Sequence, residues 1–143
     1  RLPPPPRVVA LYFRAMANEL PGQDTPRALV RYTAADRVEV HFKPDRTFTV
    51  EGIQQMMAAR QQLGVSGPHE VLMIMPEHVD FDLAMISTDH YRQVPQPNTL
   101  AVAWVARTER NATFTRMYLA YFPPPFPSAV FLTEAEARTW LGW

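Results

Sequence analysis

Two short apolar runs constrain this chain more than any other feature. Residues 71–75 read VLMIM and residues 100–106 read LAVAWVA, with no polar side chain in either run. A strand with one solvated face alternates apolar and polar residues, whereas a strand covered on both faces is continuously apolar. Both runs are far shorter than the roughly 18 residues that a membrane-spanning helix needs. They therefore predict two central strands of a sheet that is covered on both faces.

Further strands are predicted on either side of these two. Residues 29–32 and 38–42 are rich in β-forming side chains, and the second segment alternates apolar and polar residues. Ala35 and Asp36 fit a turn between them, so these two segments predict an antiparallel hairpin. Residues 129–132 predict the last strand.

Helical patterns separate the later strands. Thr49 is a suitable N-cap for a helix over residues 50–63, and Gly64 is a suitable C-cap. Residues 81–92 are weakly helical, and residues 109–122 predict a longer helix. Thr133 followed by Glu136 has the spacing of a capping box for a terminal helix.

This order of elements predicts the fold class. Strands that alternate with helices favour parallel pairing, and the first hairpin adds an antiparallel edge. We expect an α/β domain with a single mixed, mostly parallel sheet of four to five strands, covered by about four helices. At 143 residues the chain fits one such domain.

The N-terminal segment differs from the rest. Residues 3–6 are four consecutive prolines, which favour an extended polyproline conformation and offer no core. We expect residues 1–27 to form a Pro-rich, flexible segment and residues 28–143 to form the domain. Because the chain begins with Arg1, one hypothesis makes Met16 the natural start. The alternative is an ordinary tail, or a short helix over residues 7–17.

Charge and cysteine content exclude several classes of protein. The 14 basic and 14 acidic side chains balance, and no basic stripe indicates binding to nucleic acid or to an anionic membrane surface. The absence of cysteine excludes disulfides, zinc sites with thiolate ligands and thiol nucleophiles. No segment is apolar for long enough to predict a membrane span. We expect a soluble, cytoplasmic protein.

The C-terminal third resembles a known family. Residues 122–127 read FPPPFP, residues 130–137 read VFLTEAEA, and Trp140 and Leu141 follow. This combination of turn, strand and capped helix is similar to the SpoIIAA-like family, whose fold is that of STAS domains and is related to lipid-binding CRAL-TRIO domains. The resemblance covers about residues 28–143.

The resemblance implies a function without catalysis. STAS domains mostly bind protein partners, and some bind nucleotides or lipids. The best-known members are switched by phosphorylation of a serine at the start of the helix after the central strand. Residues 79–86, which correspond to that place, contain no serine. The resemblance therefore implies a bacterial regulatory or interaction module but does not extend to this switch.

The likeliest rim of a binding site follows the central strand. Ligands of open α/β sheets bind outside the carboxyl ends of the strands, and Glu77, His78, Asp80 and Asp82 lie just beyond residues 71–75. Phe126, in the proline-rich turn, is a further candidate for a partner contact. These five residues form the predicted rim for a ligand or a partner.

Neither a metal site nor a catalytic site is indicated in the same region. The His and carboxylate residues between positions 77 and 90 match no zinc motif, and Asp80 and Asp82 fit better as helix caps. Ser87, Asp89 and His90 have the residue types of a hydrolase triad, but neighbours in sequence do not supply its geometry. We predict no catalytic residue, no metal and no cofactor.

Methionine content leaves a second function open. Six methionines recur at positions expected to face the core, and their flexible side chains suit either ordinary packing or an adaptable apolar cavity. They are Met56, Met57, Met73, Met75, Met85 and Met117. We predict first a protein-interaction module with an unknown protein partner, a homodimer being one arrangement. The alternative is a carrier that holds a small apolar molecule or lipid between sheet and helices.

Overall fold

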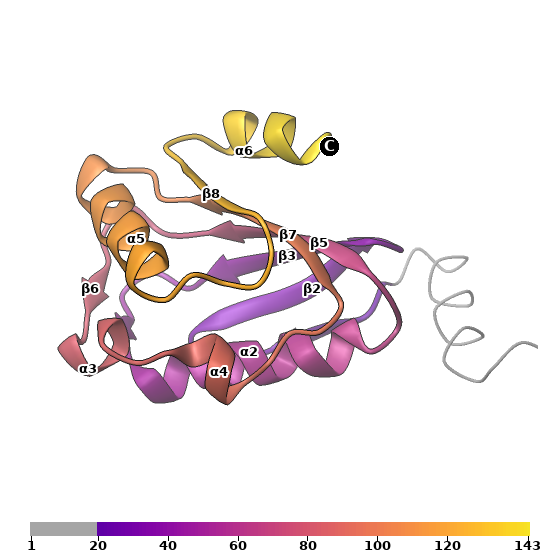
Figure 1. Ribbon diagram of the computed structural model, residues 1–143, viewed down its shortest axis with the longest axis horizontal. Helices are drawn as coiled ribbons and strands as arrows, with labels where there is room; N and C mark the ends of the chain where they lie inside the picture. Colours follow the sequence, from indigo (N-terminus) through magenta and orange to yellow (C-terminus); the bar gives the residue numbers. More distant parts are fainter. Residues whose placement is uncertain (1–19) are drawn as a thin grey trace, which may run out of the picture.

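The computed structural model describes residues 20–143, and these form a sheet with helices on both faces (Figure 1). The six strands of the main sheet are β1 (Gly22–Asp24), β2 (Ala28–Ala34), β3 (Arg37–Phe42), β5 (His69–Ile74), β7 (Thr99–Val105) and β8 (Ser128–Phe131). They lie side by side in the order β1-β2-β3-β5-β7-β8. The pairs from β1 to β3 are antiparallel, and the pairs from β3 to β8 are parallel.

The helices of the described residues connect the parallel strands or follow the last one. They are α2 (Val50–Gly64), α3 (Leu83–Ile86), α4 (His90–Gln93), α5 (Glu109–Tyr121) and α6 (Glu134–Leu141). A separate parallel pair, β4 (Thr47–Phe48) with β6 (Asp80–Phe81), lies beside the main sheet. No helix among residues 20–143 is long and apolar enough to cross a lipid bilayer.

The expected mixed, mostly parallel sheet is confirmed, but the expected number of strands is too low. All five strands predicted from the sequence are present, and β1 is the sixth. Its three residues are exposed and polar or glycine, so they carry no hydrophobic pattern; they join the sheet by pairing with residues 29–31 of β2. β1 lies inside the segment 1–27 that we expected to be flexible. Residues 1–19, with the proline run, Met16 and the helix considered for residues 7–17, lie outside the described residues.

The helix expected over residues 81–92 is two short helices. The hydroxyl groups of Ser87 and Thr88 donate to the backbone carbonyls of Leu83 and Ala84, at 3.0 and 2.6 Å. These bonds compete with continuation of the helix. Asp89 then begins α4 by accepting a hydrogen bond from the backbone N–H of Arg92.

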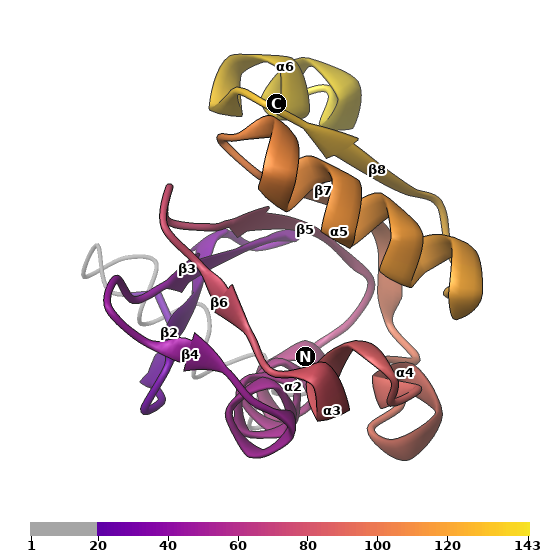
Figure 2. The same ribbon diagram turned by 90° about the vertical axis from the view of Figure 1, so that its left-hand side faces the viewer.

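Strand order decides which face each helix covers. From β3 to β8, each parallel strand lies beside the preceding one and always on the same side of it. Right-handed connections that all step in one direction place their helices on one face. Accordingly α2, α3, α4 and α5 share one face of the sheet, and α6, which follows the last strand, lies on the other (Figures 1 and 2).

The two central strands divide the core into two layers. Val71 and Met73 of β5 point to the helices α2 to α5, whereas Leu72 and Ile74 point to α6. All four side chains are at most 5% exposed. Burial on both faces, predicted from the apolar runs, is therefore confirmed for β5. In β7 it holds for Val102, Ala103 and Val105, which are at most 1% exposed, but not for Leu100, which is 55% exposed.

A buried carboxylate anchors α6 on its face of the sheet. Glu39 of β3 is 6% exposed, and its two oxygens accept from Arg138 Nη2 at 3.1 Å and from His41 Nε2 at 2.8 Å. The C-terminal Trp143 adds a hydrogen bond from its indole Nε1 to Glu70 at 3.2 Å. Burial of Glu39 opposes its ionisation, but the bonds from His41 and Arg138 prevail, so the pKa of Glu39 is lowered.

We predict that Glu39→Gln lowers the free energy of unfolding by about 1–3 kcal/mol at pH 7, because it removes two charge-assisted hydrogen bonds. A lowered pKa stabilises the fold above the ordinary value of 4.5, and this contribution disappears as the pH falls through the folded-state pKa. Denaturant unfolding at pH 7 and pH 3 measures both effects. Glu77→Gln, which changes an exposed glutamate in the same way, is the matched control. Equal losses for Glu39→Gln at both pH values would contradict the prediction.

Candidate functional site

Four of the five predicted rim residues lie together, at the end of the central strand. Glu77, His78, Asp80 and Asp82 are exposed and lie between β5 and α3. Asp82 is the N-cap of α3 and accepts from the backbone N–H of Ala84 at 3.4 Å. Glu77 also borders an open groove with His41 and Arg107, beyond the carboxyl ends of β3 and β5.

Phe126 lies near the opposite ends of the parallel strands from these four residues. It precedes β8, which runs parallel to β7 and hence to β5, so it is near the amino ends of these strands. Its ring is partly buried and packs edge-on against Tyr91, with 5.1 Å between ring centroids. The predicted rim is therefore not one continuous site.

The three residues considered for a triad have structural partners instead. Ser87 donates to a backbone carbonyl, Asp89 caps α4, and His90 is buried at 3% exposure. Among residues 20–143 no three His, Asp or Glu side chains lie close enough together to hold a metal ion.

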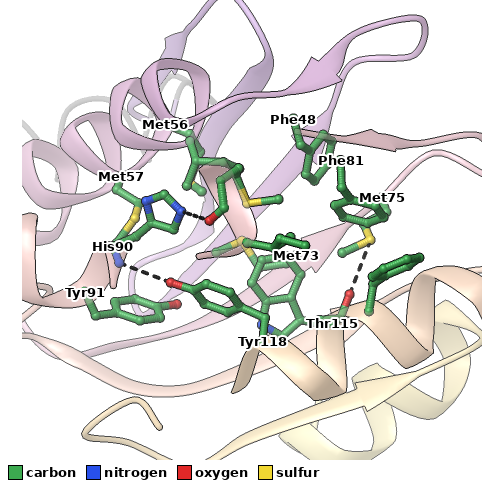
Figure 3. Close-up of a pocket in the computed structure, with 15 residues that line it drawn as sticks. Phe48, Met56, Met57, Met73, Met75, Phe81, His90, Tyr91, Thr115 and Tyr118 are labelled. Carbon is green, nitrogen blue, oxygen red and sulfur yellow. Dashed lines mark hydrogen bonds between the residues drawn. The ribbon is translucent and has the colours of Figure 1, made fainter. Parts of the chain in front are cut away.

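An apolar cavity between the sheet and the helices is the most distinctive internal feature of the described residues. It has a volume of about 50 Å³ and lies between β5 and β7 on one side and α2 to α5 on the other (Figure 3). The aromatic pair Phe48 and Phe81, from β4 and β6, closes one end with their rings 5.4 Å apart. The lining residues are Phe48, Ile53, Met56, Met57, Met73, Met75, Phe81, Met85, Ile86, His90, Tyr91, Trp104, Phe114, Thr115 and Tyr118.

Methionine dominates this lining. Five of the six methionines selected from the sequence border the cavity, and they come from α2, the end of β5 and α3. The sixth, Met117, is 53% exposed on α5. Thioether side chains are flexible and polarizable, so a wall of this kind can adjust its shape around an apolar guest.

Most polar groups beside the cavity are bound to the protein, but His90 Nδ1 and Trp104 Nε1 are buried without a partner among residues 20–143. His90 Nε2 donates to the carbonyl of Met85 at 2.8 Å, and the backbone N–H of His90 donates to the Tyr118 hydroxyl at 3.1 Å (Figure 3). That hydroxyl in turn donates to the carbonyl of Thr88 at 2.8 Å. Thr115 donates to the carbonyl of Asn111 at 2.8 Å, and its hydroxyl also lies 3.9 Å from Met75 Sδ. These bonds fix α3 and α4 against α5.

The titratable side chains of the lining favour their neutral forms. Burial lowers the pKa of His90, more than the nearby Met85 carbonyl and Asp89 raise it. Burial also raises the pKa of Tyr118 to about 12. No Asp, Glu, Lys or Arg belongs to the described lining. The cavity is therefore suited to binding an uncharged, apolar molecule.

Sequence reasoning found part of this site. Met56, Met57, Met73, Met75 and Met85 were expected to face the core, and all five border the cavity. Phe48, His90 and Tyr91 were missed because they lie in a two-residue strand and a four-residue helix, which are too short to show a periodic pattern. Phe48 packs against Phe42 and Phe81, His90 against Tyr118, and Tyr91 against Phe126, and all of these contacts are distant in sequence or come from other elements.

Comparison with known structures shows a distant likeness. No family model matches the chain, and no curated protein matches it. The crystal structure of apo-SiaC from Pseudomonas aeruginosa is similar with a TM-score of 0.47 and 14% sequence identity, over 77% of this chain and 98% of that one. A likeness at this level is no basis for transferring function. The resemblance to the SpoIIAA-like family stays a prediction.

We predict that the free energy of unfolding falls as the pH is lowered from 7 to 5, partly because His90 is buried. Its pKa is lowered below the ordinary 6.5, so in this range the unfolded chain takes up a proton that the folded protein does not. His90→Gln keeps a side-chain N–H for the Met85 carbonyl but does not titrate. Its free energy of unfolding should therefore depend less on pH than that of the wild type. The free energy of unfolding is measured with denaturant at several pH values. If it changes with pH equally in His90→Gln and in the wild type, the assignment to His90 is contradicted.

Proposed function

We propose that this domain is a non-catalytic binding module that holds a small apolar molecule in the cavity between its sheet and its helices. The supporting observation is the lining itself, in which five methionines and several aromatic rings surround an uncharged space. The sequence favours a protein-interaction module over a carrier; we place the carrier first because of this lining. A SpoIIAA-like, STAS-type assignment is part of the proposal and rests on residues 122–141.

The size of the cavity limits its ligand. A cavity of about 50 Å³ holds a few water-sized spheres, since one such sphere occupies roughly 10–15 Å³ on the same measure. Most polar groups at the wall are engaged by the protein, so a ligand gains from a hydrogen-bonding group of its own only at His90 Nδ1 or Trp104 Nε1. A short alkyl chain fits these conditions, and the methionine side chains must move to admit an aromatic ring or anything larger.

We predict that benzene, used as a probe, produces saturable shifts in the methyl NMR signals of Met56, Met57, Met73, Met75 and Met85. The exposed Met117 is an internal control and should not shift. Met85→Phe fills the cavity and should abolish the saturable shifts of the remaining methyl signals. Leu83→Phe adds a ring on the same helix, where Leu83 is 74% exposed, and should leave binding intact. Equal, unsaturated shifts of all six methyl signals would reject the carrier function.

A second candidate, the interaction module, is favoured by the outer face of α5. Met117 and Tyr121 lie one turn apart and are 53% and 78% exposed. The other exposed residues of α5 are Thr113, Ala120 and three charged residues, Glu109, Arg110 and Arg116. A self-complementary patch forms a closed two-fold dimer, the commonest soluble oligomer. A second copy of this chain is therefore the partner we assign to this face.

For this second candidate we predict a dimer mass by light scattering at micromolar concentration, and a monomer mass for Tyr121→Ser. The substitution should leave thermal stability nearly unchanged, because Tyr121 is exposed. Val65→Ser, which alters an exposed apolar residue on another face, is the control. A wild-type monomer at all accessible concentrations would exclude the homodimer.

A further inference from the structure

Arg60 has an unusual environment for a charged residue. It lies on α2 and is 1% exposed, which places it among the most buried large side chains of the described residues. No carboxylate of residues 20–143 lies within 4.0 Å of its guanidinium nitrogens. Buried charges are ordinarily paired, because removing an ion from water costs several kcal/mol even after the protein relaxes.

The neighbours of Arg60 satisfy it only in part. Its Nη2 donates to the Thr99 hydroxyl at 3.2 Å, and its Nη1 lies at the 3.5 Å limit from the Tyr91 hydroxyl. Its Nε is buried and has no partner among the described residues. The guanidinium also lies over the Tyr91 ring, 5.9 Å from the centroid. These contacts orient the group, but none of them neutralises its charge.

The C-terminal end of α2 does not supply the missing acceptor. The negative end of a helix dipole favours a cation, but its last carbonyls must be free for direct contact. The Leu63 carbonyl accepts from the Tyr32 hydroxyl at 2.9 Å, and the Gly64 carbonyl accepts from Asn98 Nδ2 at 2.7 Å. Neither carbonyl is bonded to Arg60.

A small pocket opens beside Arg60. It has a volume of about 40 Å³ and lies between the end of α2 and the amino ends of β5 and β7. Six of its nine lining residues are polar or charged, unlike those of the methionine-lined cavity, but the surface that they turn toward the pocket is mostly apolar. The residues are Arg60, Gln61, Gly64, Val65, His69, Gln96, Pro97, Asn98 and Thr99.

His69 adds a second unpartnered group to this pocket. The residue is 2% exposed, and its Nδ1 lies 3.0 Å from the Gly67 carbonyl. A carbonyl only accepts, so Nδ1 carries the proton and Nε2 of the neutral ring is an acceptor. Nε2 is buried without a partner among residues 20–143. Burial, together with the charge of Arg60, lowers the pKa of His69, which keeps the ring neutral.

We propose that Arg60, Thr99 and His69 form a binding subsite for a phosphate group. The guanidinium presents N–H donors to phosphate oxygens, and charge-assisted bonds of this kind are strong and directional. Thr99 has a hydroxyl beside the guanidinium. The acceptor Nε2 of His69 requires a ligand O–H, which protonated phosphate has and a carboxylate lacks. The site does not depend on the methionine-lined cavity.

Inorganic phosphate is the probe for a test by thermal unfolding at pH 7. We expect 20 mM phosphate, compared with chloride at equal ionic strength, to raise the Tm of the wild type by about 3 °C or more. Arg60→Met should lose this shift. Without phosphate, Arg60→Met should unfold at the same temperature as the wild type or higher, because Met fills similar space without a desolvated charge. Arg92→Met removes an exposed arginine of α4 and should retain the full shift.

Three results would overturn the proposal. They are no phosphate-specific shift in the wild type, the same shift in Arg60→Met, and an equal shift with acetate, which would indicate a general anion effect. If Arg60→Met does not fold, amide NMR of the wild type decides the question. Saturable phosphate shifts centred on Thr99 and His69 support the subsite, whereas shifts that do not saturate, or that spread over the surface, reject it.

Discussion

The constraint on which the rest of the structure depends is the stepwise order of the parallel strands. Because β3, β5, β7 and β8 succeed one another in a single direction, their connections place α2 to α5 on one face of the sheet. Four helices of very unequal length must then share that face, and two of them have only four residues. Helices this short do not pack as regular cylinders, so single side chains such as Met85 and His90 fill the space between longer elements. The apolar cavity lies where this filling is incomplete.

The same constraint explains why the other face is covered only in part. Only α6 is available to cover it, and it packs on β5, β7 and β8. The antiparallel strands β2 and β3 are left with an open side, where Arg31 and His41 reach solvent and Glu39 is buried at the margin. Arg138 of α6 closes that margin by pairing with Glu39. Attachment of the last helix thus combines an apolar contact over the parallel strands with one buried ion pair at its border.

Local sequence signals predicted the elements that are long or fully buried. The runs at residues 71–75 and 100–106 became β5 and β7, and Thr133 caps α6 as its spacing with Glu136 indicated. β1 was missed because its pairing is by backbone alone. The small pair β4–β6 was missed because each strand has two residues, and its parallel register joins positions 47–48 to positions 80–81. Such pairs depend on tertiary packing, which no local pattern encodes.

The candidate sites differ in what their sequence could reveal. Methionines at helical spacing gave a signal for the cavity, although the same spacing suits an ordinary core. Arg60 gave the opposite signal, since a charged residue among apolar neighbours on α2 is typical of the margin of a helix face. Its burial follows from α4 and the start of β7, which cover it from positions 91 and 99. A charge that the fold buries without a counterion lowers stability, and a neutral side chain of similar size would avoid that cost. An anionic ligand supplies the counterion and hence a physical reason for an arginine at this position.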